Sequence, residues 1–355
     1  MHSRLRSLHP LDPLLLAAPF ALAAASLHWS PAALFFTSGL AIVPLARLIG
    51  ASTEQLAGRL GAAAGGLLNA TFGNATELII AFFALQANLT EVVKASLIGS
   101  ILGNILAVLG LACFLGGLKR ERQRFDRTAA SAAGAQLAVA AGALLIPAVL
   151  AATSPIKAPQ VERLSVVAAI VLLLGYGAGL VFSLRTHAHL YAQEQKEGVA
   201  VQDWSVRRSV IVLLLATIGV AYLSELLVEG VKGVTEGLGW TPTFVGVILI
   251  ALIGNAAEHA SAVSVAVRGQ MDLSLSIALG SAAQIALFVA PVLVLIGLAI
   301  GHPIDLLFDR FSLAGIAIAV ALVNLLIHDG ESTWLEGAQL LTVYLLLAAA
   351  FFIRP

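Results

Sequence analysis

Two glutamates stand out because each lies inside a long apolar stretch of the chain. Glu77 ends the sequence Gly-Asn-Ala-Thr-Glu, and Glu258 ends the sequence Gly-Asn-Ala-Ala-Glu. An ionised side chain in the middle of a membrane costs about 2.5–3.5 kcal/mol even on the lenient insertion scales. Each carboxylate therefore needs a partner, a water-filled cavity or a proton, and all three suit a site that carries ions. A buried structural hydrogen bond is the alternative for each glutamate taken singly.

The residues beside the glutamates favour a hard cation such as calcium. Calcium takes six to eight oxygen ligands from carboxylates, amides, backbone carbonyls and water. Asn74 and Asn255 each precede a glutamate by three positions, which places an amide and a carboxylate on one face of a helix. Gly73 and Gly254 are expected to loosen the helix there and to free backbone carbonyls for the ion. Neither segment contains a cysteine, which disfavours zinc or copper.

The same two carboxylates predict proton exchange. A bound calcium ion neutralises both charges, whereas two facing carboxylates without the ion repel each other in a medium of low dielectric and favour protonation. The site would then hold either one calcium ion or about two protons. Calcium and protons are thus the predicted substrates, and no cofactor is expected.

A second pair of motifs follows each glutamate at the same spacing. Gly-Ser occurs 26 positions after the first glycine of each motif, at 99–100 and at 280–281. Ser100, Asn104, Ser281 and Gln284 are predicted to face the glutamates and to position carboxylates or water. Small-residue helix packing is the alternative for the serines, while large amides are expensive at membrane depth. His259, directly after the second glutamate, is either a proton relay or a satisfied structural histidine.

The composition places these motifs in a membrane protein. Hydrophobic residues make up 59% of the 355 residues and charged residues 11%, with a mean hydropathy of +0.95, whereas soluble domains carry about 25% charged residues. The formal net charge is zero, so nothing indicates a nucleic-acid partner. The apolar N-terminal stretch has no convincing cleavage site and is predicted to be a membrane helix rather than a signal peptide.

Spans of about 20 apolar residues predict an all-α protein with eleven membrane helices. The predicted helices cover residues 11–28, 31–49, 63–87, 92–117, 128–151, 162–184, 208–229, 240–267, 272–300, 311–327 and 335–353.

The duplicated motifs predict an inverted repeat. They fall in the third and eighth predicted helices. Because these helices are five apart, an odd number, the two segments cross the membrane in opposite directions. The predicted organisation is an N-terminal tail and extra helix (1–30), a first five-helix repeat (31–184), a cytoplasmic linker (185–207) and a second five-helix repeat (208–355). Fourteen of the 20 Lys and Arg residues fall on one side, which predicts a cytoplasmic N-terminus and an external C-terminus.

These motifs resemble the calcium/cation antiporter superfamily, and within it the cation/proton exchanger branch. The resemblance covers nearly the whole chain and includes the stretches 42–46 and 51–54. It implies an integral membrane antiporter, with Glu77, Glu258, Asn74 and Asn255 at the ion site. Sodium/calcium exchangers of the superfamily typically place Ser/Thr and Pro before the equivalent glutamates, so the forms found here imply proton coupling.

The predicted function is therefore a calcium/proton antiporter in a bacterial inner membrane, exporting calcium by alternating access. Two alternatives remain at this point. The first is a broader cation/proton antiporter for sodium, potassium or manganese. The second is a channel with a ring of carboxylates, although a channel usually gathers its ring by oligomerisation. The sequence shows no paired intramembrane aspartates or Ser/His arrangement of a membrane hydrolase, so an enzyme is not predicted. The oligomeric state stays open.

Overall fold

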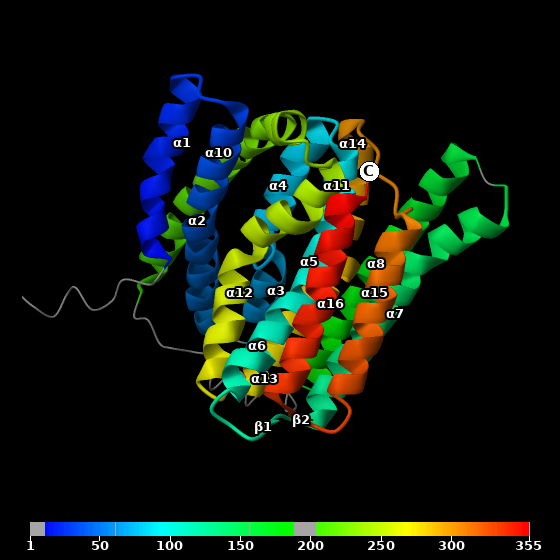
Figure 1. Ribbon diagram of the computed structural model, residues 1–355. Helices are drawn as coiled ribbons and strands as arrows, with labels where there is room; N and C mark the ends of the chain where they lie inside the picture. Colours follow the sequence, from blue (N-terminus) through cyan, green and yellow to red (C-terminus); the bar gives the residue numbers. More distant parts are fainter. Residues whose placement is uncertain (1–10, 61, 156, 188–203, 355) are drawn as a thin grey trace, which may run out of the picture.

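The computed structural model describes residues 11–60, 62–155, 157–187 and 204–354. The first ten residues of the predicted N-terminal tail and most of the predicted cytoplasmic linker lie outside the described residues. Within the described parts the chain is helical apart from turns and one two-stranded ribbon, which confirms the all-α prediction. Figure 1 shows the helices as one bundle.

The helices form eleven consecutive segments. Several of them contain a π-helical or 3₁₀ turn, labelled η. The first three are η2 (Asp12–Leu16) with α1 (Ala17–Ser26), α2 (Pro31–Leu60), and α3 (Ala62–Phe72) with α4 (Ala75–Gln86). The next three are α5 (Thr90–Leu102) with η3 (Gly103–Val108) and α6 (Leu109–Gly117), α7 (Arg127–Thr153), and α8 (Ala158–Val181) with η4 (Phe182–Thr186).

The second half of the chain supplies the remaining five segments. They are α10 (Val206–Leu238), α11 (Pro242–Phe244) with η6 (Val245–Ile250) and α12 (Ala251–Val267), α13 (Met271–Gln284) with η7 (Ile285–Val289) and α14 (Ala290–Ile300), α15 (Arg310–Leu326) and α16 (Trp334–Ile353). The ribbon pairs β1 (Gln123–Arg124) with β2 (Glu331–Ser332) in antiparallel fashion.

Eight of these segments in the described chain are long and apolar enough to cross a membrane. Three shorter apolar helices, Asp12–Ser26, Ala75–Gln86 and Arg310–Leu326, complete the eleven. Soluble proteins of this size do not bury so many uninterrupted apolar helices, whereas a bilayer requires them. The chain is an integral membrane protein, and the eleven predicted segments correspond to the eleven observed ones.

Two helices run further than predicted. α2 continues to Leu60 and α10 to Leu238, whereas the apolar spans were predicted to end at residues 49 and 229. The added turns pack against the rest of the protein, since Thr53 of α2 and Val234 of α10 are fully buried. Tertiary packing stabilises a helix beyond its apolar span, so hydropathy alone underestimates its length. The two long helices lie against each other at glycines: a Cβ atom on Gly230 would lie 2.7 Å from the backbone nitrogen of Phe35.

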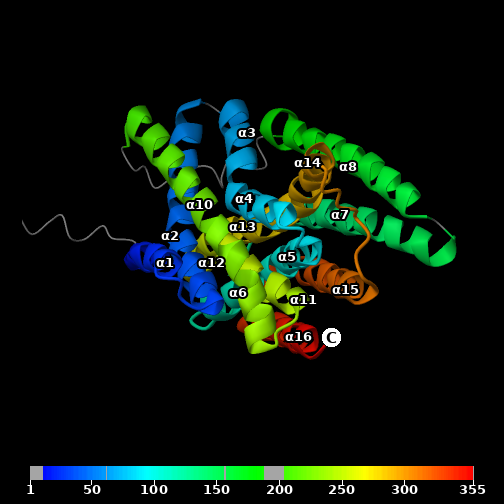
Figure 2. The same cartoon turned by 90° about the horizontal axis from the view of Figure 1, so that it is seen from above.

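The bundle has three parts when it is viewed along the helices. α1, α2 and α10 lie on one side, α7 and α8 lie on the other, and α5, α12 and α13 lie between them (Figure 2). The largest cluster of buried apolar side chains is in this central part and reaches α7, α8 and α15. The two glutamate motifs therefore come from helices at the centre of the bundle.

The two halves show matching features at their motifs. α4 lies above α3 in Figure 1, whereas α12 lies below α11, so the two glutamate-bearing segments run in opposite directions. The π-helical turns η3 and η7 begin three and four residues after the serines of the two Gly-Ser motifs, at Gly103 and Ile285. π-helical turns are rare and are frequent at functional sites, so their matched positions mark this level of the bundle.

Candidate ion-binding site

The two glutamate motifs meet at the centre of the bundle. Glu77 lies in the first turn of α4, and Glu258 lies within α12. A Cβ atom on Gly254 would lie 3.2 Å from Cγ of Glu77 and 3.8 Å from its Oε1, so the first glutamate packs against the second motif. This contact joins segments that are about half the chain apart in sequence.

Gly73 and Gly254 have different roles in the structure, although both were predicted to loosen the helix. The chain leaves the helix at Gly73 and Asn74, between α3 and α4, and this confirms the predicted interruption in the first motif. Gly254 is inside the uninterrupted helix α12, so the predicted loosening at this position is wrong. The glycine is needed for space instead, because a side chain there would press on Glu77.

The two carboxylates interact directly through their charges. Glu77 and Glu258 are close enough to repel each other when both are ionised, and the Ser281 hydroxyl donates a hydrogen bond to Glu258. Both side chains are half-buried. The Oε2 atom of each is buried with no hydrogen-bond partner among the described residues. Each carboxylate thus keeps one oxygen free for another group.

A network of amides and hydroxyls joins the two halves beside the carboxylates. Asn255 donates to the Ser100 hydroxyl at 2.9 Å and to the Ala251 carbonyl at 3.0 Å. Asn104 donates to Oδ1 of Asn255 at 3.2 Å and to the Ser281 hydroxyl at 3.1 Å. Asn104, Ser100 and Asn255 are at most 4% exposed. The structure therefore brings four of the predicted residues into one buried cluster.

A second and smaller set of amide contacts lies beside Glu77. Asn74 donates to Oε1 of Gln284 at 2.5 Å, and its own Oδ1 atom has no partner among the described residues. Oδ1 of Asn104 is likewise buried without a partner. Buried oxygens are nearly always hydrogen-bonded in native proteins. Carboxylate and amide oxygens are the types of ligand that calcium takes in proteins.

His259 occupies the edge of this cluster. A Cβ atom on Gly103 would lie 3.9 Å from Cε1 of His259, so the ring packs beside the start of η3. Its Nε2 atom is buried and has no partner among the described residues. Both predicted interpretations, a proton relay and a structural histidine, therefore stay open.

A small cavity beside Glu77 adds a residue that the sequence analysis missed. It has a volume of about 10 Å³, room for about one water molecule, and it is lined by Glu77, Ser96 and Ser100 together with apolar side chains. Ser96 precedes Ser100 by one helical turn, and this spacing was the signal that could have identified it. The lining also includes Ile285, the first residue of η7.

His259 is the one histidine identified beside the two carboxylates. Within the described parts of the chain, no three or more His, Cys, Asp and Glu side chains come together. Cys113 is buried in α6. Amide and hydroxyl groups therefore supply the rest of the site.

Comparison with known proteins adds an independent observation. The model of the sodium/calcium exchanger protein family matches residues 30–185 and 208–353. The Ca²⁺/H⁺ antiporter of Synechocystis sp. is 47% identical over 359 residues, which cover 96% of each chain. The Ca²⁺/H⁺ antiporter ChaA of Bacillus subtilis is 43% identical over 94% of this chain and 96% of its own.

A solved structure of the Ca²⁺/H⁺ antiporter YfkE has the same fold. It superimposes with a TM-score of 0.85 at 40% sequence identity, over 97% of this chain and 99% of the other. The resemblance predicted from the motifs is confirmed by the family model, the relatives and this structure together. The chain belongs to the sodium/calcium exchanger protein family.

Proposed function

We propose that this protein is a proton-coupled calcium antiporter, in which Glu77 and Glu258 bind either one calcium ion or protons. One observation carries the proposal: two intramembrane carboxylates meet at the centre of the bundle, each with an unpartnered oxygen, and amide oxygens lie beside them. The relatives at 43–47% identity are Ca²⁺/H⁺ antiporters, and this activity agrees with the arrangement.

Calcium would bind to the unpartnered carboxylate and amide oxygens. Glu77 and Glu258 supply both negative charges, and Asn74 and Asn104 supply neutral oxygens. Asn255 was predicted as a ligand, but its oxygen accepts a hydrogen bond from Asn104 while its nitrogen donates to Ser100. We therefore propose that Asn255 holds the network in place and that Asn104 supplies the second amide oxygen. Calcium accepts an irregular shell of six to eight oxygens, so backbone carbonyls and water complete the coordination.

Proton exchange follows from removing the ion. The two carboxylates repel each other at low dielectric, and protonation removes that repulsion. The Ser281 hydroxyl can donate to an ionised Glu258 or accept from a protonated one, since a hydroxyl does both. Gln284 and Ser100 keep the surrounding amides oriented in both states. Calcium and protons therefore compete for one site.

Alternating access would operate between two inverted repeats of residues 31–184 and 208–355, with 1–30 as an extra element and 185–207 as the linker. The two stretches matched by the family model, 30–185 and 208–353, support this division. The cavity beside Glu77 has room for about one water.

We infer the orientation from the basic residues. Lys119, Arg122 and Arg124 lie at or near the ribbon end of the bundle, and excess positive charge marks the cytoplasmic side. The N-terminus and the linker would then be cytoplasmic, and the C-terminus external. In a bacterial inner membrane, protons entering through the protein would drive calcium out.

The proposal is tested by calcium-dependent proton flux in proteoliposomes. We expect Glu77→Gln and Glu258→Gln each to lower the flux at least tenfold, since a lost charged ligand costs more than about 1.4 kcal/mol. Glu236→Gln is the matched control, because Glu236 is exposed near the end of α10. Full flux in either site variant would refute the assigned roles.

The same assay identifies the cation. Calcium is compared with sodium, potassium and manganese under one imposed pH gradient. A calcium antiporter gives saturating flux with calcium in excess of the monovalent ions. Equal flux with sodium or potassium would instead support the broader cation/proton antiporter, and flux that does not saturate would support a channel.

A further inference from the structure

Ser96 lies outside the duplicated motifs but lines the small cavity beside Glu77. The cavity has a volume of about 10 Å³, which is room for about one water molecule. Its polar side chains are those of Glu77, Ser96 and Ser100, and the remaining wall consists of apolar side chains and Gly254. Because the space holds one small molecule, these three polar groups surround a single position.

This position is beside the proposed calcium site rather than within it. Glu258, Asn74 and Asn104 are not among the described residues that line the cavity. A calcium ion placed there would meet one of the two carboxylates that the proposed site requires. A neutral molecule of the size of water suits one carboxylate and two hydroxyls instead.

Ser96 has no counterpart in the second half of the chain. It precedes the glycine of the first Gly-Ser motif by three residues, and Ile277 precedes the glycine of the second by the same number. The second half thus has an apolar side chain where the first half has a hydroxyl. The duplication does not account for this serine, so its role concerns the first carboxylate.

The two carboxylates also differ in how a hydroxyl reaches them. The Ser281 hydroxyl donates directly to Glu258. The matching Ser100 hydroxyl accepts from Asn255 at 2.9 Å, and in the described part of the chain no side-chain hydroxyl donates directly to Glu77. A water-sized space lies beside the first carboxylate where the second has a direct hydroxyl bond.

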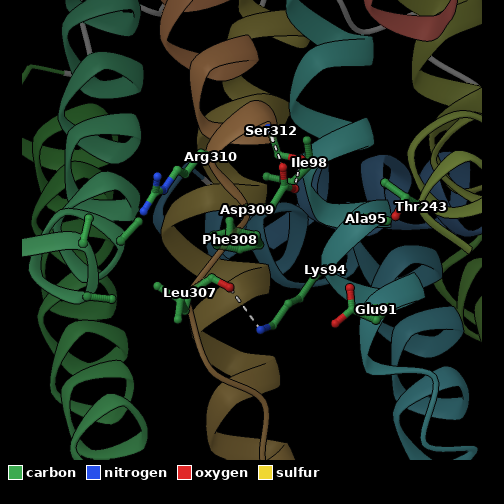
Figure 3. A pocket seen from close by; sticks show the side chains of 13 residues that line it. Glu91, Lys94, Ala95, Ile98, Thr243, Leu307, Phe308, Asp309, Arg310 and Ser312 are labelled. Atoms are coloured by element: carbon green, nitrogen blue, oxygen red, sulfur yellow. Dashed lines mark hydrogen bonds between the residues drawn. The ribbon is translucent and has the colours of Figure 1, made fainter. Parts of the chain in front are cut away.

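The other face of α5 is anchored, which fixes the position of Ser96. Lys94 donates to Asp305 at 2.6 Å and to the Leu307 carbonyl at 3.1 Å (Figure 3). Lys94 lines a separate cavity of about 380 Å³, to which Ser96 does not contribute. Rotation of α5 that turned Ser96 away from Glu77 would have to break the bonds of Lys94.

The two serines have complementary hydrogen-bonding capacity left. A hydroxyl has one hydrogen to donate and two lone pairs to accept. Ser96 donates its hydrogen to the Val93 carbonyl at 2.9 Å, so its oxygen is left to accept. Ser100 accepts from Asn255, so its hydrogen is left to donate. A water between them can donate to Ser96 and to the Glu77 carboxylate and accept from Ser100, with one lone pair left over.

We propose that Ser96 holds a water molecule that binds the transported calcium ion beside Glu77, which makes Ser96 a positioning residue. This inference rests on the proposed calcium site. Calcium takes water among its six to eight oxygen ligands, and the hydrogens of such a water must point away from the ion. Ser96 and Glu77 accept these two hydrogens. Without the Ser96 oxygen one hydrogen has no acceptor, so the water binds calcium less tightly.

Calcium binding to the purified full chain, measured by titration calorimetry, and transport in proteoliposomes test this proposal together. Ser96→Val and Ser96→Thr have nearly the same shape and differ in the hydroxyl. We expect Ser96→Val to raise the Kd and the calcium concentration for half-maximal transport about fivefold, the effect of one hydrogen bond. The maximal rate should stay unchanged, and Ser96→Thr should keep the wild-type Kd.

Two further variants guard against a purely structural effect. Ser96→Ala removes the oxygen without filling the space and should weaken calcium binding as Ser96→Val does. Ser183→Val is the matched control, because Ser183 also donates to the carbonyl three residues before it and lines neither cavity. Thermal unfolding checks that each variant is folded.

Three results would overturn the role of Ser96. The first is a wild-type Kd in both Ser96→Val and Ser96→Ala. The second is equal loss in Ser96→Thr and Ser96→Val, since shape would then matter rather than the hydroxyl. The third is a lower maximal rate with an unchanged Kd. Glu77→Gln separates these results from failure of the calcium site itself, because an unchanged Kd in that variant would refute the proposed site.

Discussion

At the scale of single residues, the site contains buried oxygen atoms that have no hydrogen-bond partner among the described residues, whereas buried oxygens normally have one. The unpartnered Oε2 atoms of Glu77 and Glu258 sit beside amides whose remaining bonds fix their direction. Nitrogens of Asn104, Asn255 and Asn74 point at other protein groups. In Asn74 and Asn104 this orientation leaves the oxygen rather than the nitrogen available, which suits a cation, whereas the Asn255 oxygen accepts from Asn104.

Gly254 tests how closely the two halves must approach. Gly254→Ala would place a Cβ atom 3.2 Å from Cγ of Glu77, so the carboxylate must move by a few tenths of an ångström. We expect the calcium concentration for half-maximal transport to rise about threefold to tenfold, below the roughly 10²-fold cost of a 1 Å misplacement. Gly142→Ala, where nothing lies within 4 Å, is the control. Unchanged calcium dependence in Gly254→Ala would contradict the described contact.

At the scale of helices, the matching glycines of the two Gly-Ser motifs pack differently. Gly99 and Gly280 occupy matching positions, 26 residues after each motif glycine. A Cβ atom on Gly99 would lie 2.0 Å from the Val247 carbonyl oxygen, where α5 crosses η6, whereas nothing lies within 4 Å of one on Gly280. The first glycine permits a close helix crossing, and the second has no such neighbour.

Alanine substitution at the two positions is expected to give opposite results. Gly99→Ala should separate α5 from η6 and destabilise the protein by at least about 2 kcal/mol, as overpacking against a backbone does. Gly280→Ala should be neutral or stabilise α13 by about 0.5–1 kcal/mol, since glycine is unfavourable inside a helix. Thermal unfolding in detergent measures both. Equal destabilisation by the two variants would contradict the asymmetry.

The start of α15 predicts a pH dependence outside the membrane-spanning helices. Burial raises the pKa of the Asp309 carboxyl, but hydrogen bonds from Ser312 and Arg354 outweigh burial and hold that pKa below its usual value. A lowered pKa in the folded state stabilises the fold above the unfolded pKa of about 3.9, and this contribution is lost as the pH falls through the folded value.

Asp309→Asn should therefore lower the Tm at pH 7 by no more than about 2–4 °C, because a partly exposed ion pair contributes at most about 1 kcal/mol. Asparagine still caps the start of α15, so the change in Tm reports only the loss of the negative charge of Asp309. The difference from wild type should shrink below about pH 4. A difference of the same size at pH 3 and pH 7 would show that the charge is not responsible.

Much of this fold could be predicted from the sequence, because bilayer thickness fixes how long an apolar helix must be. All eleven segments correspond to predicted spans, and the paired motifs identified the residues that meet at the centre. The ends of α2 and α10 could not be predicted, since their added turns are stabilised by packing against distant parts of the chain, as the burial of Thr53 and Val234 shows. The role of Gly254 could not be predicted either, because it depends on a contact with Glu77 from the other half of the chain.

At the scale of the whole molecule, the site exists only because distant segments converge. Asn74 bonds to Gln284, and Asn104 bonds to Asn255 and Ser281, so every amide contact of the site that involves two helices joins the halves. Any movement of one half relative to the other changes the distances between these oxygens. The two proposed states, calcium-loaded and protonated, are therefore expected to differ across this central contact.

The most direct test of the central claim measures calcium and proton movement together in proteoliposomes with an imposed pH gradient. Wild type should move calcium against its own gradient and move protons the opposite way, and both fluxes should reverse when the pH gradient is reversed. Glu77→Gln/Glu258→Gln should show neither flux, while Glu236→Gln should match wild type. Calcium flux that ignores the direction of the pH gradient, or that persists in the double variant, would contradict the account.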